Sequence, residues 1–157
     1  MGSRNVYTKM KLAHQIKISV FVKEDEDETL IVDKLKELIP FEDLDKEKII
    51  INKTPTIGFE DKKIDILEVI LKREKHVKTF LEYIMKKLSE EQKELLLKQV
   101  ESRLDEENNF FFRLDKEKLL EGEYWVTDRG NCFHIKITIA AFPKTRENAK
   151  EVIQKII

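Results

Sequence analysis

The sequence predicts an α+β fold, an antiparallel or mixed sheet of about five strands with helices packed on one face. Residues 16–23 and 132–141 alternate between apolar and polar side chains, as half-buried strands do. Residues 75–88 repeat apolar side chains at helical spacing instead. The predicted strands are not regularly separated by helices, which disfavours a doubly wound parallel sheet.

The 157 residues are the length of one ordinary domain. We expect a loose segment over 1–12 and a single α+β domain over 13–157. Charged residues make up 39% of the chain, while Gly and Pro number only four and three. This composition is typical of proteins from organisms that live in hot environments, and a lysine-rich mesophilic protein is the alternative.

The charge balance gives no overall basic signal, because 30 basic and 31 acidic residues leave a net charge of -1. A local basic patch remains compatible with it. The single cysteine, Cys132, fits a reducing cytoplasm. No apolar run approaches the ~18 residues of a membrane span, so we expect a cytoplasmic protein with no membrane partner.

The first half of the chain predicts two strands and a helix before residue 58. The first strand directs one set of side chains inward (Ile16, Ile18, Val20, Val22) and another outward (Lys17, Ser19, Phe21, Lys23). A helix over 27–39 has acidic residues at its start and ends before Pro40. A short β-branched strand follows over 48–53, and 54–58 is predicted to be a connection.

The middle of the chain predicts one strand and two helices. The strand over 64–72 has two possible phases; we favour Leu67, Val69 and Leu71 inward, because the opposite phase buries Glu68. A bulge would reconcile the two phases. The helix over 75–88 is followed by a capping box at 89–92, which begins a second helix.

The second half predicts two more strands and a final helix. Phe110, Phe112 and Leu114 share one face of a strand, and Phe111 and Arg113 share the other. A helical turn is expected over 115–120, ending at Gly122. Residues 128–131 predict a turn, the last strand follows to Pro143, and Thr145 caps the final helix.

The outer face of this predicted sheet is the main candidate site. It combines basic, aromatic and imidazole side chains: Lys17, Phe21, Lys23, Phe111, Arg113, His134 and Lys136. Cations neutralise phosphates, and exposed aromatic rings stack on unpaired bases. The face is therefore suited to single-stranded RNA, while a homodimer contact or an ordinary solvated surface also explains it.

Two smaller groups are weaker candidates. Cys132 and His134 share a strand face, an arrangement that can serve a nucleophile, with Asp128 as an orienting group. No glycine-rich elbow or oxyanion motif accompanies them, and His14 and His76 show no ligand spacing, so we expect no metal. Arg103, Arg113 and Arg129 can bind phosphates, but the nearby Asp105 and Asp115 make structural ion pairs the favoured explanation.

Several blocks resemble an archaeal family of small RNA-binding proteins. They are Leu95 to Glu106, Phe110 to Lys116, Cys132 to Ile137 and Ala140 to Pro143, with Ile18 to Asp27 and Gly58 to Glu60 in the first half. The resemblance covers about residues 13–157. That family is described as a predicted exosome subunit, with a fold similar to the large-subunit ribosomal protein that binds 5S ribosomal RNA.

The resemblance implies RNA as the partner, beside the exosome or near ribosomal RNA. It carries no established catalytic residues and no cofactor. We therefore expect a non-enzymatic RNA-binding protein, whose candidate contacts are the seven outer-face residues together with Arg103 and Arg129. A protein-interaction or homodimer module is the alternative.

Overall fold

The structure is a computed structural model that describes residues 10–157. Its elements follow in the order β1 (Ala13–Lys23), α2 (Glu28–Leu38), β2 (Asn52–Ile57), η1 (Phe59–Asp61), β3 (Lys63–Leu71), α3 (Glu74–Lys87), α4 (Glu90–Lys98), α5 (Val100–Arg103), β4 (Asn109–Asp115), α6 (Lys116–Leu120), β5 (Val126–Thr127), β6 (Cys132–Ile139) and α7 (Arg146–Ile156). The strands form one sheet in the order β2-β3-β1-β6-β4-β5, with every neighbouring pair antiparallel.

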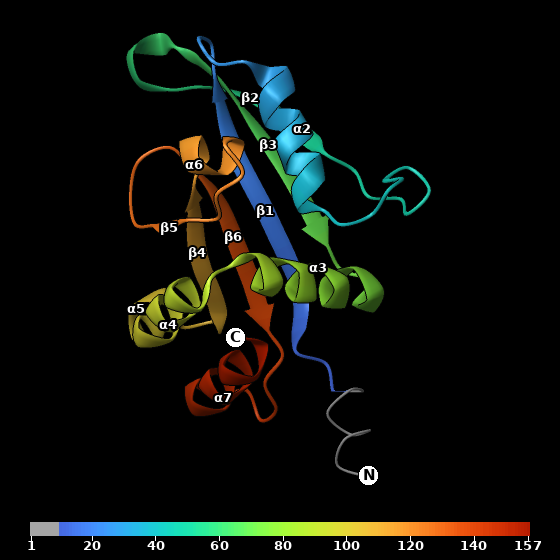
Figure 1. The fold of residues 1–157 in the computed structure, drawn as a ribbon, viewed down its shortest axis with the longest axis vertical. Coiled ribbons are helices and arrows are strands. Elements are labelled where there is room, and N and C mark those ends of the chain that lie inside the picture. Colours follow the sequence, from blue (N-terminus) through green and yellow to red (C-terminus); the bar gives the residue numbers. More distant parts are fainter. Residues whose placement is uncertain (1–9) are drawn as a thin grey trace.

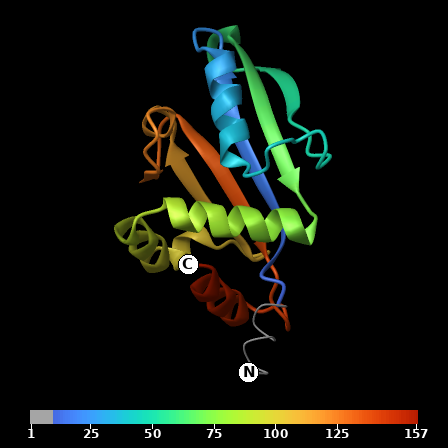
Figure 2. The ribbon, with the colours of Figure 1, turned by 45° about the vertical axis from the view of Figure 1, so that its right-hand side comes forward.

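The fold has two layers, as predicted. The helices α2 and α3 cross one face of the sheet, and α7 lies near one end of it (Figures 1 and 2). The opposite face carries partly exposed side chains, because alternate residues of each strand point away from the helices. This surface, called the open face below, is built mainly from outward residues of β1, β3, β4 and β6: Lys17, Ser19, Phe21, Lys23, Ile66, Glu68, Ile70, Phe111, Arg113, His134 and Lys136.

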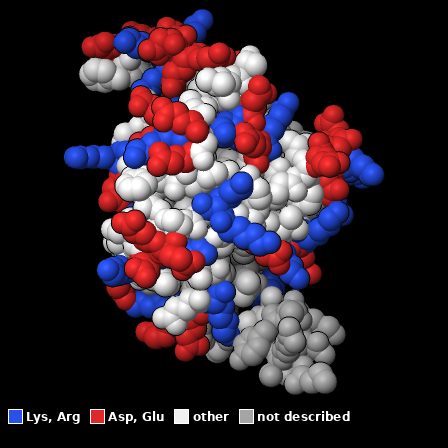
Figure 3. All heavy atoms as spheres, viewed as in Figure 1, with Lys and Arg blue, Asp and Glu red and all other residues white. Residues whose placement is uncertain are grey.

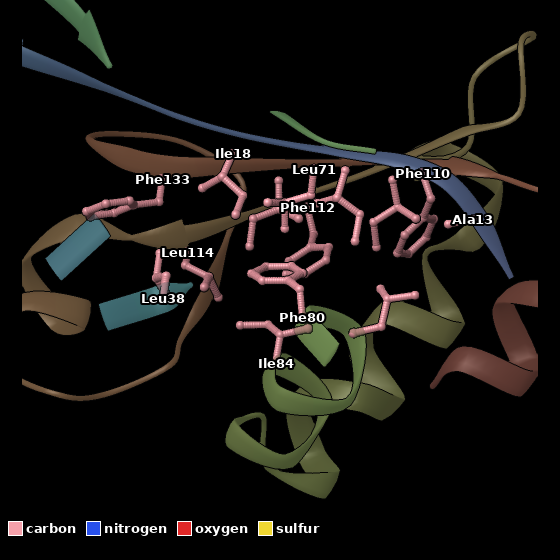
Figure 4. Close-up of a cluster of buried hydrophobic side chains, with 14 of the residues drawn as sticks. Ala13, Ile18, Leu38, Leu71, Phe80, Ile84, Phe110, Phe112, Leu114 and Phe133 are labelled. Atoms are coloured by element: carbon pink, nitrogen blue, oxygen red, sulfur yellow. The ribbon is translucent and has the colours of Figure 1, made fainter. Parts of the chain in front are cut away.

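The core lies between the sheet and the helices. Phe80 and Ile84 of α3 point toward Phe110 and Phe112 of β4, and all four side chains are at most 1% exposed (Figure 4). Burial of large aromatic and aliphatic groups supplies most of the driving force for folding. The paired phenylalanines therefore fix β4 against α3, which leaves Phe111 between them on the open face.

β1 lies in the middle of the sheet and joins its two halves, because it pairs with β3 on one side and with β6 on the other. Ile16 lies opposite Leu71 of β3 and also opposite Ile137 of β6. The strands before residue 72 lie on one side of it and those after residue 108 lie on the other. Both halves of the chain therefore depend on β1 for their register.

Most local predictions are confirmed. The strand over 63–71 takes the favoured phase, with Leu67, Val69 and Leu71 buried and Ile70 38% exposed. The predicted Ser89 and Thr145 caps accept hydrogen bonds from backbone N–H groups three residues later. These caps satisfy N–H groups that have no partner within the helix.

The strand predicted over 48–53 was placed too early. Residues 44–49 form a turn, in which Lys48 has a φ of 60° and the Ile49 N–H bonds to the Leu44 carbonyl. The strand instead occupies 52–57, which overlaps the end of the predicted strand and most of the predicted connection over 54–58. Pro55 lies within it, which is tolerated because β2 is an edge strand and has an unpaired side.

Two further elements differ from expectation. The helix that begins after Ser89 breaks at Gln99, so α4 and the short α5 replace one continuous helix. The two-residue strand β5 was not predicted and brings the sheet to six strands within residues 10–157. Residues 1–9 of the predicted loose segment lie outside the described residues. Among residues 10–157, no helix has the length and apolar character of a membrane span.

Candidate nucleic-acid interface

The strand register brings the predicted site residues of three strands into two rows across the open face. In one row, Lys17 of β1 lies opposite Lys136 of β6, which lies opposite Phe111 of β4. In the next row, Ser19 lies opposite His134, which lies opposite Arg113. The residues predicted from three separate segments are therefore neighbours.

The two lysines of the first row differ in their partners. The Lys17 ammonium group lies 2.8 Å from a carboxylate oxygen of Glu68 on β3, so much of its charge is balanced. The Lys136 Nζ lies 6.0 Å from the centre of the Phe111 ring, a cation–π distance. Like charges opposite each other on neighbouring strands repel, so this row is suited to an anion. The more available cation is Lys136.

Aromatic side chains lie on both sides of His134. The rings of Phe21 and His134 have their centres 5.9 Å apart, with a tilt of 39°. Phe21 is 44% exposed and Phe111 is 40% exposed, although both belong to strands whose other faces are in the core. Exposed rings at this level of accessibility are available for stacking with a planar ligand.

Cys132 and His134 are closer than a strand repeat implies, because the Cys132 Sγ lies 3.5 Å from the His134 Nε2. Burial raises the pKa of the Cys132 thiol above its ordinary value. Burial, followed by the positive charge of Arg113, lowers the pKa of His134. Both shifts favour the neutral pair, whereas a nucleophilic site needs a thiolate beside a protonated imidazole.

The arginines meet at the β4–β5 edge of the open face. The Arg103 Nη2 donates to Asp128 Oδ1 at 2.7 Å, and the Arg113 Nη1 donates to the Asp128 backbone carbonyl at 2.8 Å. Arg129 is exposed in the adjoining turn. Arg103, Arg113 and Asp128 border a shallow hollow of about 210 Å³, whose other lining residues are Ser102, Phe111, Phe112 and Thr127.

The acids predicted to pair with these arginines have other partners. Asp115 caps α6 by accepting the Lys118 N–H. Asp105 accepts backbone N–H groups of Glu107 and Asn109. Burial alone would raise its pKa, but these hydrogen bonds hold the pKa of Asp105 below its ordinary value. Asp128 is therefore the acid that organises the arginine cluster.

Lys23 lies apart from this cluster, at the end of β1. It borders a second hollow of about 430 Å³ whose other lining residues include Glu24, Asp25 and Glu60. Those acids offset the local positive charge. The basic and aromatic character of the open face is thus concentrated on β6 and β4.

Other titratable side chains are dispersed. His14 is exposed, and the buried His76 bonds to Glu47 at 3.0 Å. This hydrogen bond, together with one from Lys75, lowers the pKa of Glu47. Among residues 10–157, no three His, Cys, Asp or Glu side chains are grouped to hold a metal ion.

On the face covered by helices, acidic and basic side chains are interspersed (Figure 3).

Sequence reasoning missed two residues that shape this interface. Glu68 of β3 forms an ion pair with Lys17 of β1, and this pair can be predicted only when the phase and register of β3 are known. Asp128 was considered only as an orienting group for Cys132, whereas it bonds two arginines. A polar turn that follows a two-residue strand gave no signal of this role.

Comparisons with known proteins agree with the resemblance to archaeal RNA-binding proteins. A family described as RNA binding matches residues 15–141. The RNA-binding protein PAB1135 of Pyrococcus abyssi is 27% identical over 143 residues, which cover 91% of this chain and 92% of that protein.

Solved archaeal structures share the fold. Protein AF2318 from Archaeoglobus fulgidus is 26% identical, covers 92% of this chain and 99% of its own, and superposes with a TM-score of 0.81. Mth689 from Methanothermobacter thermautotrophicus is 30% identical, covers 92% and 98%, and superposes with a TM-score of 0.75. The family model matches well more than half of this chain, and the chain therefore belongs to the family described as RNA binding.

Proposed function

We propose that the protein binds single-stranded RNA on the β6–β4 part of the open face, and that it does so without catalysing a reaction. The observation that carries this proposal is the cluster of Phe111, Lys136, Arg113 and His134, which two register pairs of β4 with β6 place together on one face. Membership of the RNA-binding family supports the ligand class. The shifted pKa values of Cys132 and His134 favour their neutral forms, which disfavours a nucleophilic role for this pair.

The proposed contacts divide by chemistry. Bases stack on the exposed rings of Phe111 on β4 and Phe21 on β1, two strands that are separated by β6. Lys136 and Arg113 neutralise backbone phosphates between them. Arg129, Lys17 and Lys23 add charge at the margins, and Lys17 must first exchange its Glu68 partner.

A double charge reversal tests this assignment. Arg113→Glu combined with Lys136→Glu should abolish binding of a short single-stranded RNA in fluorescence anisotropy, because it reverses two cations beside the stacking ring. The matched control is Lys78→Glu with Lys86→Glu, two exposed lysines of α3 on the other side of the molecule. It makes the same change in net charge and should reduce affinity only slightly. Equal losses in the two variants would refute the open-face assignment.

The salt dependence should be shallow. About three phosphate contacts give a slope of roughly -2 in a plot of log K against log salt, since each contact on a single strand contributes about -0.7. The net charge of -1 adds no long-range attraction. A slope steeper than about -4 would mean that basic groups outside this cluster carry the binding.

The biological setting we propose is that of an accessory factor in RNA processing or degradation, beside the exosome or near ribosomal RNA. The sequence resemblance supports this setting. Ultraviolet crosslinking in the native organism, followed by sequencing of the bound RNA, tests it. Enrichment of ribosomal RNA or of exosome substrates is expected, and crosslinks should fall on residues 17–23, 111–113 or 134–136.

A protein-interaction or homodimer module is the second candidate. The observation that favours it is the apolar character of the β3 side of the open face, where Ile70 is 38% exposed and Ile66 lies opposite Phe21, which is 44% exposed. Light scattering during size exclusion would reveal a stable dimer, and Ile70→Glu should dissociate it. A monomer at all concentrations would exclude the homodimer.

A further inference from the structure

We propose that the hollow at the β4–β5 edge holds one guanine base of the bound RNA, separated from the stack of its neighbouring bases. This inference rests on the proposed function, since it names the base that one part of the same face selects. The hollow combines an aromatic wall, a carboxylate and a guanidinium group: Phe111, Asp128 and Arg113. These are the groups that recognise a purine with adjacent N–H donors.

The carboxylate of Asp128 is held in place but still accessible. Its Oδ1 accepts a hydrogen bond from Arg103, while its side chain is 74% exposed. A carboxylate has about four acceptor positions, so one bond from Arg103 leaves most of its capacity for a ligand. Asp128 therefore presents hydrogen-bond acceptors toward the hollow.

Arg103 is a positioning residue in this arrangement. Its side chain is only 10% exposed, and its Nε and Nη2 donate to the Gln99 Oε1 at 2.8 and 2.6 Å. Gln99, at the junction of α4 and α5, thus fixes the guanidinium group of Arg103, and the guanidinium group fixes the orientation of the Asp128 carboxylate. Thr127 also steadies the turn, because its hydroxyl donates to the Arg129 carbonyl.

Arg113 supplies the donors on the other side. Its Nη1 is anchored by the Asp128 backbone carbonyl, and the residue is exposed on the open face. An arginine has five N–H donors, so anchoring one nitrogen leaves others for a ligand. The Phe111 ring lies two positions earlier on the same strand face and is available to stack on the base.

Guanine is the base that fits this set of groups. Its Watson–Crick edge carries two adjacent donors, which a carboxylate accepts together, and its O6 and N7 accept from arginine. Adenine and cytosine each pair one amino donor with an acceptor nitrogen, which a carboxylate repels. Uracil has one donor between two carbonyl oxygens, so it also meets repulsion from Asp128.

The test compares four uridine octamers in fluorescence anisotropy, with G, A, C or U at one central position. Wild-type protein should bind the guanosine octamer about ten-fold tighter than the others, since ten-fold lies within the discrimination that a good bidentate pair gives. Asp128→Asn should lose the preference for guanosine and bind the adenosine and cytidine octamers better than the guanosine octamer, because an amide offers one acceptor and one donor.

The matched control is Asp25→Asn, which changes the charge equally at the far end of β1 and should keep the guanosine preference. Equal wild-type affinity for all four octamers would overturn the guanine site and leave RNA binding intact. A guanosine preference that survives in Asp128→Asn would overturn it as well. Failure of every octamer to bind the wild type would instead overturn the proposed function, and the inference with it.

Discussion

Lys116 offers a quantitative test of how the open face is held together. It lies at the start of α6 with only 3% of its surface exposed. Its ammonium group donates to the Phe21 carbonyl at 2.7 Å and to both carboxylate oxygens of Glu26 at 3.1 Å. The side chain therefore joins α6 to the end of β1 that carries Phe21.

Replacing Lys116 with Met removes the charge while keeping the length of the side chain. Removing one member of a buried ion pair costs about 3–5 kcal/mol, because the other member is left without its partner. The Glu26 side chain is 21% exposed and can recover some water, which places the expected loss near the lower limit, about 3 kcal/mol. The melting temperature should fall by about 6–12 °C for a chain of this size.

Urea unfolding followed by circular dichroism measures this loss. Lys118→Met is the control on the same helix, where the ammonium group lies 4.2 Å from the centre of the partly exposed Trp125 ring, and it should cost about 0.5–1 kcal/mol. Adding Glu26→Gln to Lys116→Met should recover part of the stability, because it removes the stranded carboxylate. A loss below about 1 kcal/mol for Lys116→Met would refute the argument that this ion pair is desolvated.

Three further predictions address the strands of the open face. Phe112→Ala should lower the free energy of unfolding by about 3–5 kcal/mol, because it empties a core position, whereas Phe111→Ala should cost less than about 1 kcal/mol. Phe111→Ala should nevertheless weaken RNA binding in fluorescence anisotropy. Similar losses of stability in thermal unfolding would contradict the assignment of the two side chains to opposite faces of β4. In an NMR titration of the free protein, the pKa of His134 should lie below 6.5, because of burial and the charge of Arg113, and a value at or above 6.5 would contradict this effect. The contribution of the neutral imidazole to stability is therefore present above pH 6.5 and is lost as the pH falls through the lowered pKa. Bound RNA should raise the pKa of His134. Cys132 should react with iodoacetamide at neutral pH more slowly than a free thiol, since burial raises its pKa, and rapid alkylation would indicate a thiolate that the structure does not favour.

The strand faces were predictable because periodicity is a local property. The alternation of 110–114 separates Phe110 and Phe112 from Phe111 without any knowledge of their neighbours. The same reasoning assigned Lys17, Phe21, His134 and Lys136 to the open face, where the structure places them. Faces that follow from period 2 need only the sequence of one strand.

The contacts between distant segments were not predictable in this way. Lys116 is one of 30 basic residues, and nothing in its neighbours predicts that it reaches residues 21 and 26. The ion pair of Lys17 with Glu68 depends on the register of β1 against β3. The β2 strand was misplaced because Pro55 and the isoleucines before it are misleading when the edge position of the strand is unknown.

The position of β1 between the two halves of the sheet has a consequence for synthesis of the chain. β1 can pair with β3 as soon as residue 71 has left the ribosome, but its other edge stays unpaired until β6 emerges from residue 132 onward. At about 5–20 residues per second, the roughly 60 residues between the end of β3 and the start of β6 take about 3–12 s to synthesise. During that interval a nascent chain exposes a long strand edge with an apolar face, which is the kind of surface that other chains and chaperones bind.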